Sequence, residues 1–258
     1  MAYDPPPHEN DIAPLVPDIF ISKPPIKDRL STHTSVEQDR VVDVCLPYLA
    51  GDQPDISVNR HGVPSLDRER HIRFLEKNLE NLPASFTGLD SSRPWFFYWC
   101  LNALSLLGVD VSKYRDGLVE TARSIQNESG GFGGGFGQQS HLATTYAMVL
   151  ALAIVGGESA YRVIDRRTMW KWLCALKQPD GGFQLTLGGE IDVRQVFVPL
   201  DQVHVPDREF RGAYCAAVLI TLLQLPLDLP TDSPAYTPER PDLFSGLADY
   251  VRRCKLFP

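Results

Sequence analysis

The sequence predicts an all-α protein, an α/α toroid in which helical hairpins stack side by side into a ring. The letters GGF stand at 130–132 and again at 181–183, 51 residues later, which indicates a structural repeat. Helices of two kinds alternate with these turns: one kind is apolar nearly all round and the other is amphipathic. Strand signals are scarce from residue 94 onward.

The apolar helices are expected on the inside of the ring, because a helix without a polar face must be buried on both sides. They are expected at three places: 98–108, 142–155 and 213–223. Tyr146 matches Tyr214 at a spacing of 68 residues, which exceeds the spacing of the turns by 17. We therefore predict an off-register insert at 195–211, where the sequence has two prolines and no helical periodicity.

The amphipathic helices are expected on the outside of the ring. Their apolar positions recur at helical spacing: Tyr114, Leu118, Ala122 and Ile125 in one copy, and Met169, Trp172, Leu173 and Leu176 in the next. Residues 251–255 align with 173–177, which extends the register of the repeat toward the end of the sequence.

The glycine-rich segment at 130–137 could in principle hold a phosphate, but its pattern favours a turn. It contains no G-x-G-x-x-G in any register, no G-K-[ST] follows it, and no strand precedes it. Glycine is the usual residue where a chain reverses tightly after a helix. We expect Phe132 and Phe183 to plug the two turns.

The first 33 residues contain seven prolines and little periodicity, so 1–33 is predicted to be a disordered arm. The helical domain is expected at 34–258. It should begin with a helix at 35–49, capped by Thr34 and Glu37, and a second helix at 66–82.

Composition limits the class of protein. A net charge of -7 and a pI near 5.4 argue against a nucleic-acid binder. The longest apolar stretch, 213–225, is too short to span a bilayer. The five cysteines show no C-x-x-C spacing, and Cys100, Cys174 and Cys215 lie in apolar helical sequence. We interpret these three as reduced core thiols of a cytoplasmic protein.

The ordered series of motifs resembles the β subunits of protein farnesyltransferases. It comprises SSRPWFFYW at 91–99, HLATTY at 141–146, LKQPDGGF at 176–183, GGEIDVR at 188–194 and AYCAA at 213–217. The resemblance runs from about Val36 to Cys254. It implies a prenyltransferase and terpenoid cyclase-like toroid that transfers farnesyl from farnesyl diphosphate to the cysteine of a C-terminal C-a-a-X sequence. A zinc cofactor holding the substrate thiolate and a partner α subunit are implied as well.

The resemblance also implies roles for individual residues. Trp95, Trp99, His141 and Ala143 match positions beside the C-a-a-X peptide, and Tyr146, Tyr214 and Cys215 match positions beside the isoprenoid. Arg194 matches an arginine near both substrates, although Arg211 precedes Gly-Ala-Tyr equally well. From the residues alone, the two tryptophans are equally typical of a packed core, and His141 of a helix cap.

Part of the family pattern has no counterpart in this sequence. The family's zinc ligands and the basic cluster that grips the diphosphate belong to a later segment, so no catalytic or metal-binding residue is assigned. The register of the repeat predicts a third glycine turn that ends at about position 261, whereas the chain ends at Pro258. We interpret the chain as about half of a ring, truncated or mis-spliced, and expect it to be inactive alone.

Two other functions remain open at this point, and a third is disfavoured. One is the β subunit of a type I geranylgeranyltransferase, which shares the glycine turns. Another is a non-catalytic α/α repeat module that binds an α subunit. A terpene cyclase is disfavoured, since the sequence contains no D-x-D-D motif.

Overall fold

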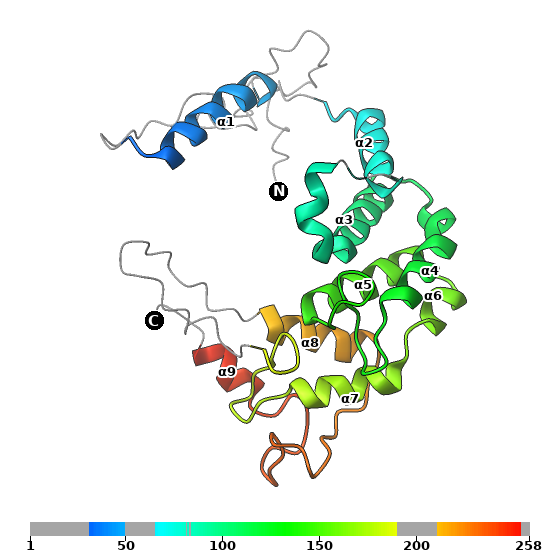
Figure 1. The fold of residues 1–258 in the computed structure, drawn as a ribbon, viewed down its shortest axis with the longest axis vertical. Coiled ribbons are helices and arrows are strands. Elements are labelled where there is room, and N and C mark those ends of the chain that lie inside the picture. The colour runs from blue at the N-terminus through cyan, green and yellow to red at the C-terminus, as the bar shows by residue number, and fades with distance from the viewer. Residues whose placement is uncertain (1–30, 50–64, 81, 83, 190–210, 254–258) are drawn as a thin grey trace, which may run out of the picture. The chain divides into compact units, whose positions relative to one another are not determined.

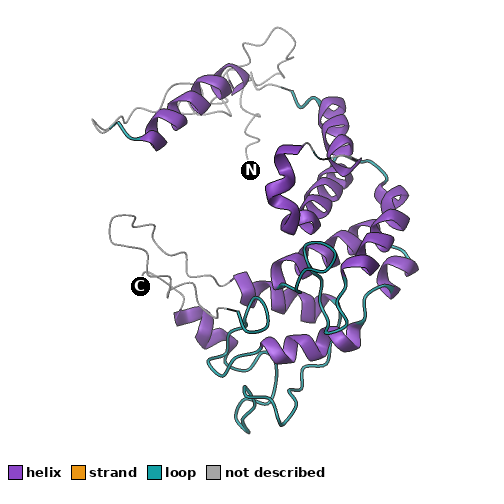
Figure 2. Cartoon of the chain, in the orientation of Figure 1, coloured by secondary structure: helices purple, strands orange, loops and turns teal. Residues whose placement is uncertain are grey.

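The computed structural model describes residues 31–49, 65–80, 82, 84–189 and 211–253, and these are mainly helical (Figures 1 and 2). The α-helices are α1 (His33–Leu49), α2 (Arg68–Glu80), α3 (Arg93–Leu106), α4 (Arg115–Ile125), α5 (Leu142–Val155), α6 (Glu158–Arg162), α7 (Arg166–Leu176), α8 (Arg211–Leu222) and α9 (Leu247–Arg253). Two 3-10 helices, η3 (Ala84–Ser92) and η4 (Val111–Tyr114), precede α3 and α4. Over the described ranges, extended pairing is limited to isolated bridges, so the all-α prediction is confirmed.

The chain divides into two compact units, 1–71 and 72–258. In the first unit, α1 begins earlier than predicted, because Thr32 and Ser35 form the cap: Ser35 N donates to Thr32 Oγ1 at 3.1 Å and Thr32 N donates to Ser35 Oγ at 3.0 Å. The predicted cap from Thr34 and Glu37 is wrong, and Glu37 instead pairs with Arg40 at 3.2 Å. The predicted arm at 1–33 lies almost entirely outside the described residues.

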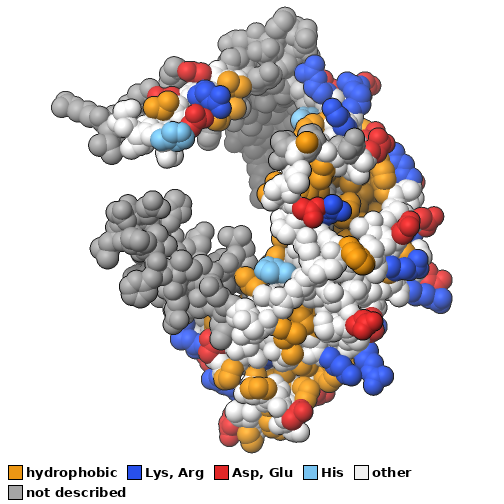
Figure 3. Space-filling view, in the orientation of Figure 1, with side chains coloured by type: hydrophobic (Ala, Val, Ile, Leu, Met, Phe, Trp, Pro, Cys, Tyr) orange, Lys and Arg blue, Asp and Glu red, His pale blue; other side chains and the backbone are white. Residues whose placement is uncertain are grey.

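The second unit has the predicted inner and outer helices. The inner helix α5 packs against both α3 and α8, and ten of its residues are buried. The outer helices α4 and α7 bury one face each, and charged side chains gather over α4 and α6 on the opposite side (Figure 3). This contrast explains why the inner helices read as apolar all round and the outer ones as amphipathic.

The two glycine turns repeat at the level of single hydrogen bonds. Asn127 N donates to Gly131 O at 3.1 Å, and Gln178 N donates to Gly182 O at 3.0 Å. Phe132 and Phe183 are 0% and 3% exposed, as predicted for residues that plug the turns. The turn prediction for 130–137 is therefore confirmed.

Each glycine turn also lies against the outer helix of the following repeat. A Cβ atom at Gly130 would lie 2.2 Å from Thr168 O on α7, and one at Gly181 would lie 2.2 Å from Gly246 O, directly before α9. The spacing of 78 residues between Thr168 and Gly246 equals the spacing in the predicted alignment of Leu173 with Val251. The structure thus agrees with the alignment of 251–255 with 173–177 over the residues it describes, and α9 follows the second turn as α7 follows the first. Residues 195–210 of the predicted insert lie outside the described residues, and Arg211 is the first residue of α8.

Candidate functional site

Five aromatic rings from the three inner helices form a continuous surface, which we call the aromatic wall. Its members are Trp95, Tyr98 and Trp99 from α3, Tyr146 from α5, and Tyr214 from α8. Ring centroids of Tyr98 and Tyr146 lie 6.2 Å apart, and those of Tyr146 and Tyr214 lie 5.8 Å apart. The three tyrosines hold corresponding positions in successive inner helices, so the repeat itself brings their rings into contact.

The tryptophans extend the wall at its α3 end. The Trp95 ring lies 5.4 Å from the Trp99 ring and 5.9 Å from the Tyr146 ring, between centroids. Trp99 is 52% exposed and Tyr214 is 57% exposed, whereas Tyr146 between the two ends is buried. Large aromatic side chains left half open in one strip are typical of a surface that binds apolar groups.

His141 acts as the N-cap of α5. Its Nδ1 accepts a hydrogen bond from Ala143 N at 3.1 Å, and its own backbone N–H donates to Phe132 O at 3.2 Å. An accepting Nδ1 leaves the proton of the neutral ring on Nε2. The half-buried Ala143 stands at the second position of the same helix, one turn before Tyr146.

The phenol of Tyr146, in the middle of the wall, keeps its proton. Burial raises the pKa of the Tyr146 phenol, and the neighbouring hydroxyl of Tyr214 raises it further. Tyr146 is therefore a hydrogen-bonding group and not an anion at neutral pH. Cys215 on α8, Cys100 and Cys174 are all buried, as predicted for core thiols.

The structure brings together four of the eight predicted site residues in the aromatic wall: Trp95, Trp99, Tyr146 and Tyr214. His141 and Ala143 lie at the start of α5, which carries Tyr146, and Cys215 follows Tyr214 on α8. Arg194 lies outside the described residues, and the side chain of Arg211 is not described either. The sequence reasoning missed Tyr98 as a site residue, although its spacing to Gly108 equals that of Tyr146 to Gly156. That equality of position was the signal that could have found it.

Metal chemistry finds no support in the part of the chain that the structure describes. No group of three or more His, Cys, Asp or Glu side chains there could hold a metal ion. Among the same residues, no helix is long and apolar enough to cross a membrane. The described site consists of aromatic rings and a capping imidazole.

Comparison with known proteins agrees with this geometry. Residues 66–257 match the profile of the prenyltransferase alpha-alpha toroid domain. The protein farnesyltransferase subunit beta of Pyricularia oryzae is 54% identical over 250 residues, which is 95% of this chain and 45% of that protein. The subunit beta of Schizosaccharomyces pombe is 37% identical over 170 residues, covering 66% of this chain and 42% of that protein. The geranylgeranyl transferase type-1 subunit beta of Arabidopsis thaliana is 25% identical over 158 residues. The chain spans about half the length of the curated relatives it matches.

Proposed function

Because the chain belongs to the prenyltransferase alpha-alpha toroid family, we propose that it acts as the β subunit of a protein farnesyltransferase. The observation that carries the proposal is the aromatic wall, which lies on the three inner helices where a toroid has its cavity. Four of the residues matched to substrate-binding positions of that family belong to it: Trp95, Trp99, Tyr146 and Tyr214.

The wall suits a farnesyl chain. An isoprenoid is a long hydrocarbon without hydrogen-bonding groups, and it binds by removing apolar surface from water. The half-open rings of Trp99 and Tyr214, with Tyr146 between them, offer apolar surface over the length of the wall. Burial of that surface stabilises the complex by about 25 cal/mol per Å². In this role Tyr98, Tyr146 and Tyr214 contact the isoprenoid. The Tyr146 phenol is neutral, so no charged group has to lose its water when the isoprenoid binds.

The second substrate in this proposal is a protein that ends in C-a-a-X. Trp95 and Trp99 bind its apolar residues, and His141 and Ala143 lie beside its path. Arg194 contacts both substrates. An α subunit of the same enzyme is the partner, and the reaction takes place in the cytoplasm.

Zinc is the cofactor that this family implies, but the described residues do not fit a zinc site. In our proposal these residues bind and orient the two substrates and exclude water from them. The zinc and the diphosphate are held by other parts of the enzyme, and no step of the transfer is assigned to a residue described here.

One alternative activity is the transfer of geranylgeranyl groups. It is supported by the 25% identity to the geranylgeranyl transferase type-1 subunit beta. That activity would use a prenyl donor one isoprene unit longer. A non-catalytic module that binds the α subunit is the other alternative, supported by the lack of a metal site among the described residues.

Farnesyl binding and transfer can be tested with the full chain co-expressed with a farnesyltransferase α subunit. Quenching of tryptophan emission should report binding of farnesyl diphosphate with higher affinity than geranylgeranyl diphosphate, and Trp99→Ala with Tyr214→Ala should weaken it about tenfold or more. Tyr161→Ala, an equally exposed aromatic on α6, is the matched control and should leave binding unchanged. Tighter binding of the longer diphosphate would support the geranylgeranyl alternative. Association with the α subunit without binding either diphosphate would support the non-catalytic module.

A further inference from the structure

The first glycine-rich turn, residues 129–140, contacts both the start of the inner helix α5 and the end of η3, which precedes the inner helix α3. At the start of α5, Phe132 N donates to Thr145 Oγ1 at 2.9 Å, and the Phe132 carbonyl accepts from Thr144 Oγ1 at 2.8 Å. On its other side the turn lies against the end of η3, which leads directly into α3. A single loop therefore holds the starts of the two helices that bring Trp95 and Tyr146 together.

The contact with η3 requires glycine. A Cβ atom at Gly134 would lie 1.9 Å from the carbonyl oxygen of Ser91 and 2.4 Å from its carbonyl carbon. Backbone atoms cannot swing aside as the end of a flexible side chain can, so any side chain at Gly134 must push η3 and the turn apart. Gly134 itself is buried.

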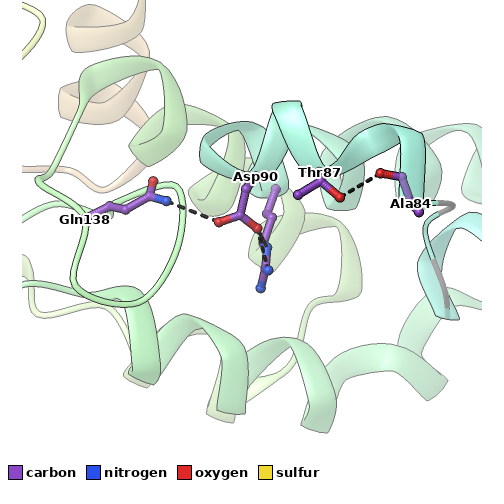
Figure 4. A network of polar contacts seen from close by, with 5 residues as sticks. Ala84, Thr87, Asp90 and Gln138 are labelled. Carbon is purple, nitrogen blue, oxygen red and sulfur yellow. Dashed lines mark hydrogen bonds and ion pairs between the residues drawn. The ribbon is translucent and has the colours of Figure 1, made fainter.

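A polar network joins the same two segments, and Figure 4 shows it between the turn and η3. Gln138 Nε2 donates to Asp90 Oδ2 at 3.4 Å, and Asp90 pairs with Arg93, the first residue of α3, at 2.5 Å. Thr87 Oγ1 donates to Ala84 O at 2.6 Å within η3. The Gln138 side chain thus reaches across to a carboxylate that is tied to the start of α3.

The second turn makes the corresponding contact with other chemistry. Leu185, the counterpart of Gly134 in the 51-residue repeat, accepts a hydrogen bond at its carbonyl from Leu142 N, the first residue of α5, at 2.8 Å. The residue of α3 that corresponds to Leu142 is Pro94, which has no N–H. The first turn therefore cannot form this hydrogen bond with α3. A contact between each turn and the start of the preceding inner helix is therefore a property of the repeat.

We propose that the turn 129–140 sets the separation of Trp95 and Tyr146, with Gly134 and Gln138 as its positioning residues. Trp95 lies in the first turn of α3 and Tyr146 near the start of α5, so a shift between these helix ends moves one ring against the other. The 5.9 Å contact of the two rings depends on the fit of the turn. This inference rests on the proposed function in one respect: the separation tunes binding of the prenyl and peptide groups.

The test uses the full chain with its α subunit and the variant Gly134→Ala. Gly88→Ala in η3 is the matched control, since a Cβ atom there would meet nothing within 4 Å. The exposure of Trp95 is measured by acrylamide quenching of tryptophan emission. The contribution of Trp95 is obtained by subtracting the emission of the same chain that also carries Trp95→Phe. We expect Gly134→Ala to change this quenching and to weaken farnesyl diphosphate binding about tenfold, while Gly88→Ala changes neither.

A second pair of variants avoids the risk that Gly134→Ala does not fold. Gln138→Glu places a carboxylate against that of Asp90. The control, Gln139→Glu, makes the same chemical change at the adjacent residue, whose side chain donates to Leu187 O instead. Only Gln138→Glu should alter Trp95 quenching, and adding Asp90→Asn should restore it, because an amide again faces a carboxylate. A role in folding alone would give a loss of stability without this rescue.

The outcomes separate the two proposals. Unchanged Trp95 quenching in both Gly134→Ala and Gln138→Glu would overturn the positioning role. Altered quenching in a chain that never binds farnesyl diphosphate, even unmodified, would support the positioning of Trp95 and overturn the proposed function.

Discussion

The two glycine turns share a backbone and differ in what surrounds it. Residues 126 and 177 hold the same place, and each forms an isolated bridge with the phenylalanine of its turn. In the first turn the residue is Gln126, whose side chain donates to Val163 O at 2.8 Å and accepts from Asp165 N at 2.9 Å. In the second turn it is Lys177, whose Nζ donates to Gly181 O at 2.8 Å and lies 4.7 Å from the centre of the Phe183 ring. At the same place in the repeat, a neutral amide therefore bonds outward to the segment before α7, whereas a buried cation bonds back into its own turn.

The comparison teaches that the two copies of the repeat share the backbone geometry of the turn, whereas the side chains that bond around it differ with the segments packed nearby. In both turns the next outer helix leaves no room for a side chain at the first glycine, as Gly130 meets Thr168 and Gly181 meets Gly246. Around the second turn, Arg240 Nη1 also donates to Pro179 O at 2.5 Å.

The largest effect is expected from alanine at the first glycine of either turn. Gly130→Ala sets a Cβ atom 2.2 Å from Thr168 O at a φ of +97°, so both sterics and backbone strain oppose it. We expect a loss of about 4 kcal/mol or more in the free energy of unfolding, measured by urea denaturation. Gly117→Ala, where a Cβ atom meets nothing within 4 Å, is the control and should be neutral or slightly stabilising. Equal losses in the two variants would contradict the close packing of the turn.

The next effect in size concerns the plugs of the turns. Phe132→Ala and Phe183→Ala each open a cavity in the core, which costs about 3–5 kcal/mol. Phe183→Ala should cost more than its counterpart, because Lys177 then loses the ring against which its charge lies. Thermal unfolding of both variants in one buffer makes the comparison, and a larger loss in Phe132→Ala would be the contrary result.

Lys177 should make stability depend on pH in a way that the first turn does not. Burial lowers its pKa from 10.5 to about 8, while Asp242 and Asp180 oppose that shift and Arg240 adds to it. Between pH 8 and pH 10.5 the unfolded chain holds the proton more tightly than the folded chain, so this group makes the folded state more stable as the pH rises. Lys177→Gln, which copies Gln126, should remove up to about 3 kcal/mol of that rise. Urea unfolding of both chains at pH 7.5 and pH 10 measures it, and parallel pH profiles would show that Lys177 titrates normally.

The smallest expected effect comes from Asp180, whose counterpart in the first turn is Ser129. Asp180 Oδ1 accepts from Gly182 N at 2.9 Å, and no such bond from a Ser129 side chain is found in the first turn as described. Asp180→Ala should therefore lower stability by about 1 kcal/mol, and Ser129→Ala by less. Chemical denaturation at pH 7 resolves the difference, and the reverse order would mean that the aspartate bond is not formed in solution.

Several parts of the fold could be predicted from local pattern alone. The spacing of GGF located both turns, and apolar periodicity separated the inner helix α5 from the outer helices α4 and α7. The start of α1 was misplaced, because Thr32 and Thr34 offer equivalent hydroxyls and the cap that forms is the reciprocal one between Thr32 and Ser35. Within the site, the pairing of Tyr146 with Tyr214 followed from the repeat. Tyr98 holds the same place in its helix and could have been found by the same reasoning, but its contact with the Tyr146 ring was seen only in the structure.

The sequence by itself determined the class of the fold, the register of its repeat, and which helices carry the aromatic rings. These properties depend on periodicity and on distance along the chain, and both can be read from letters. Only the tertiary structure decided that Lys177 is buried, that Gly134 must be glycine, and that Trp99 and Tyr214 stay half open. Those properties depend on which atoms from distant parts of the chain come to lie against each residue, and no local pattern records them.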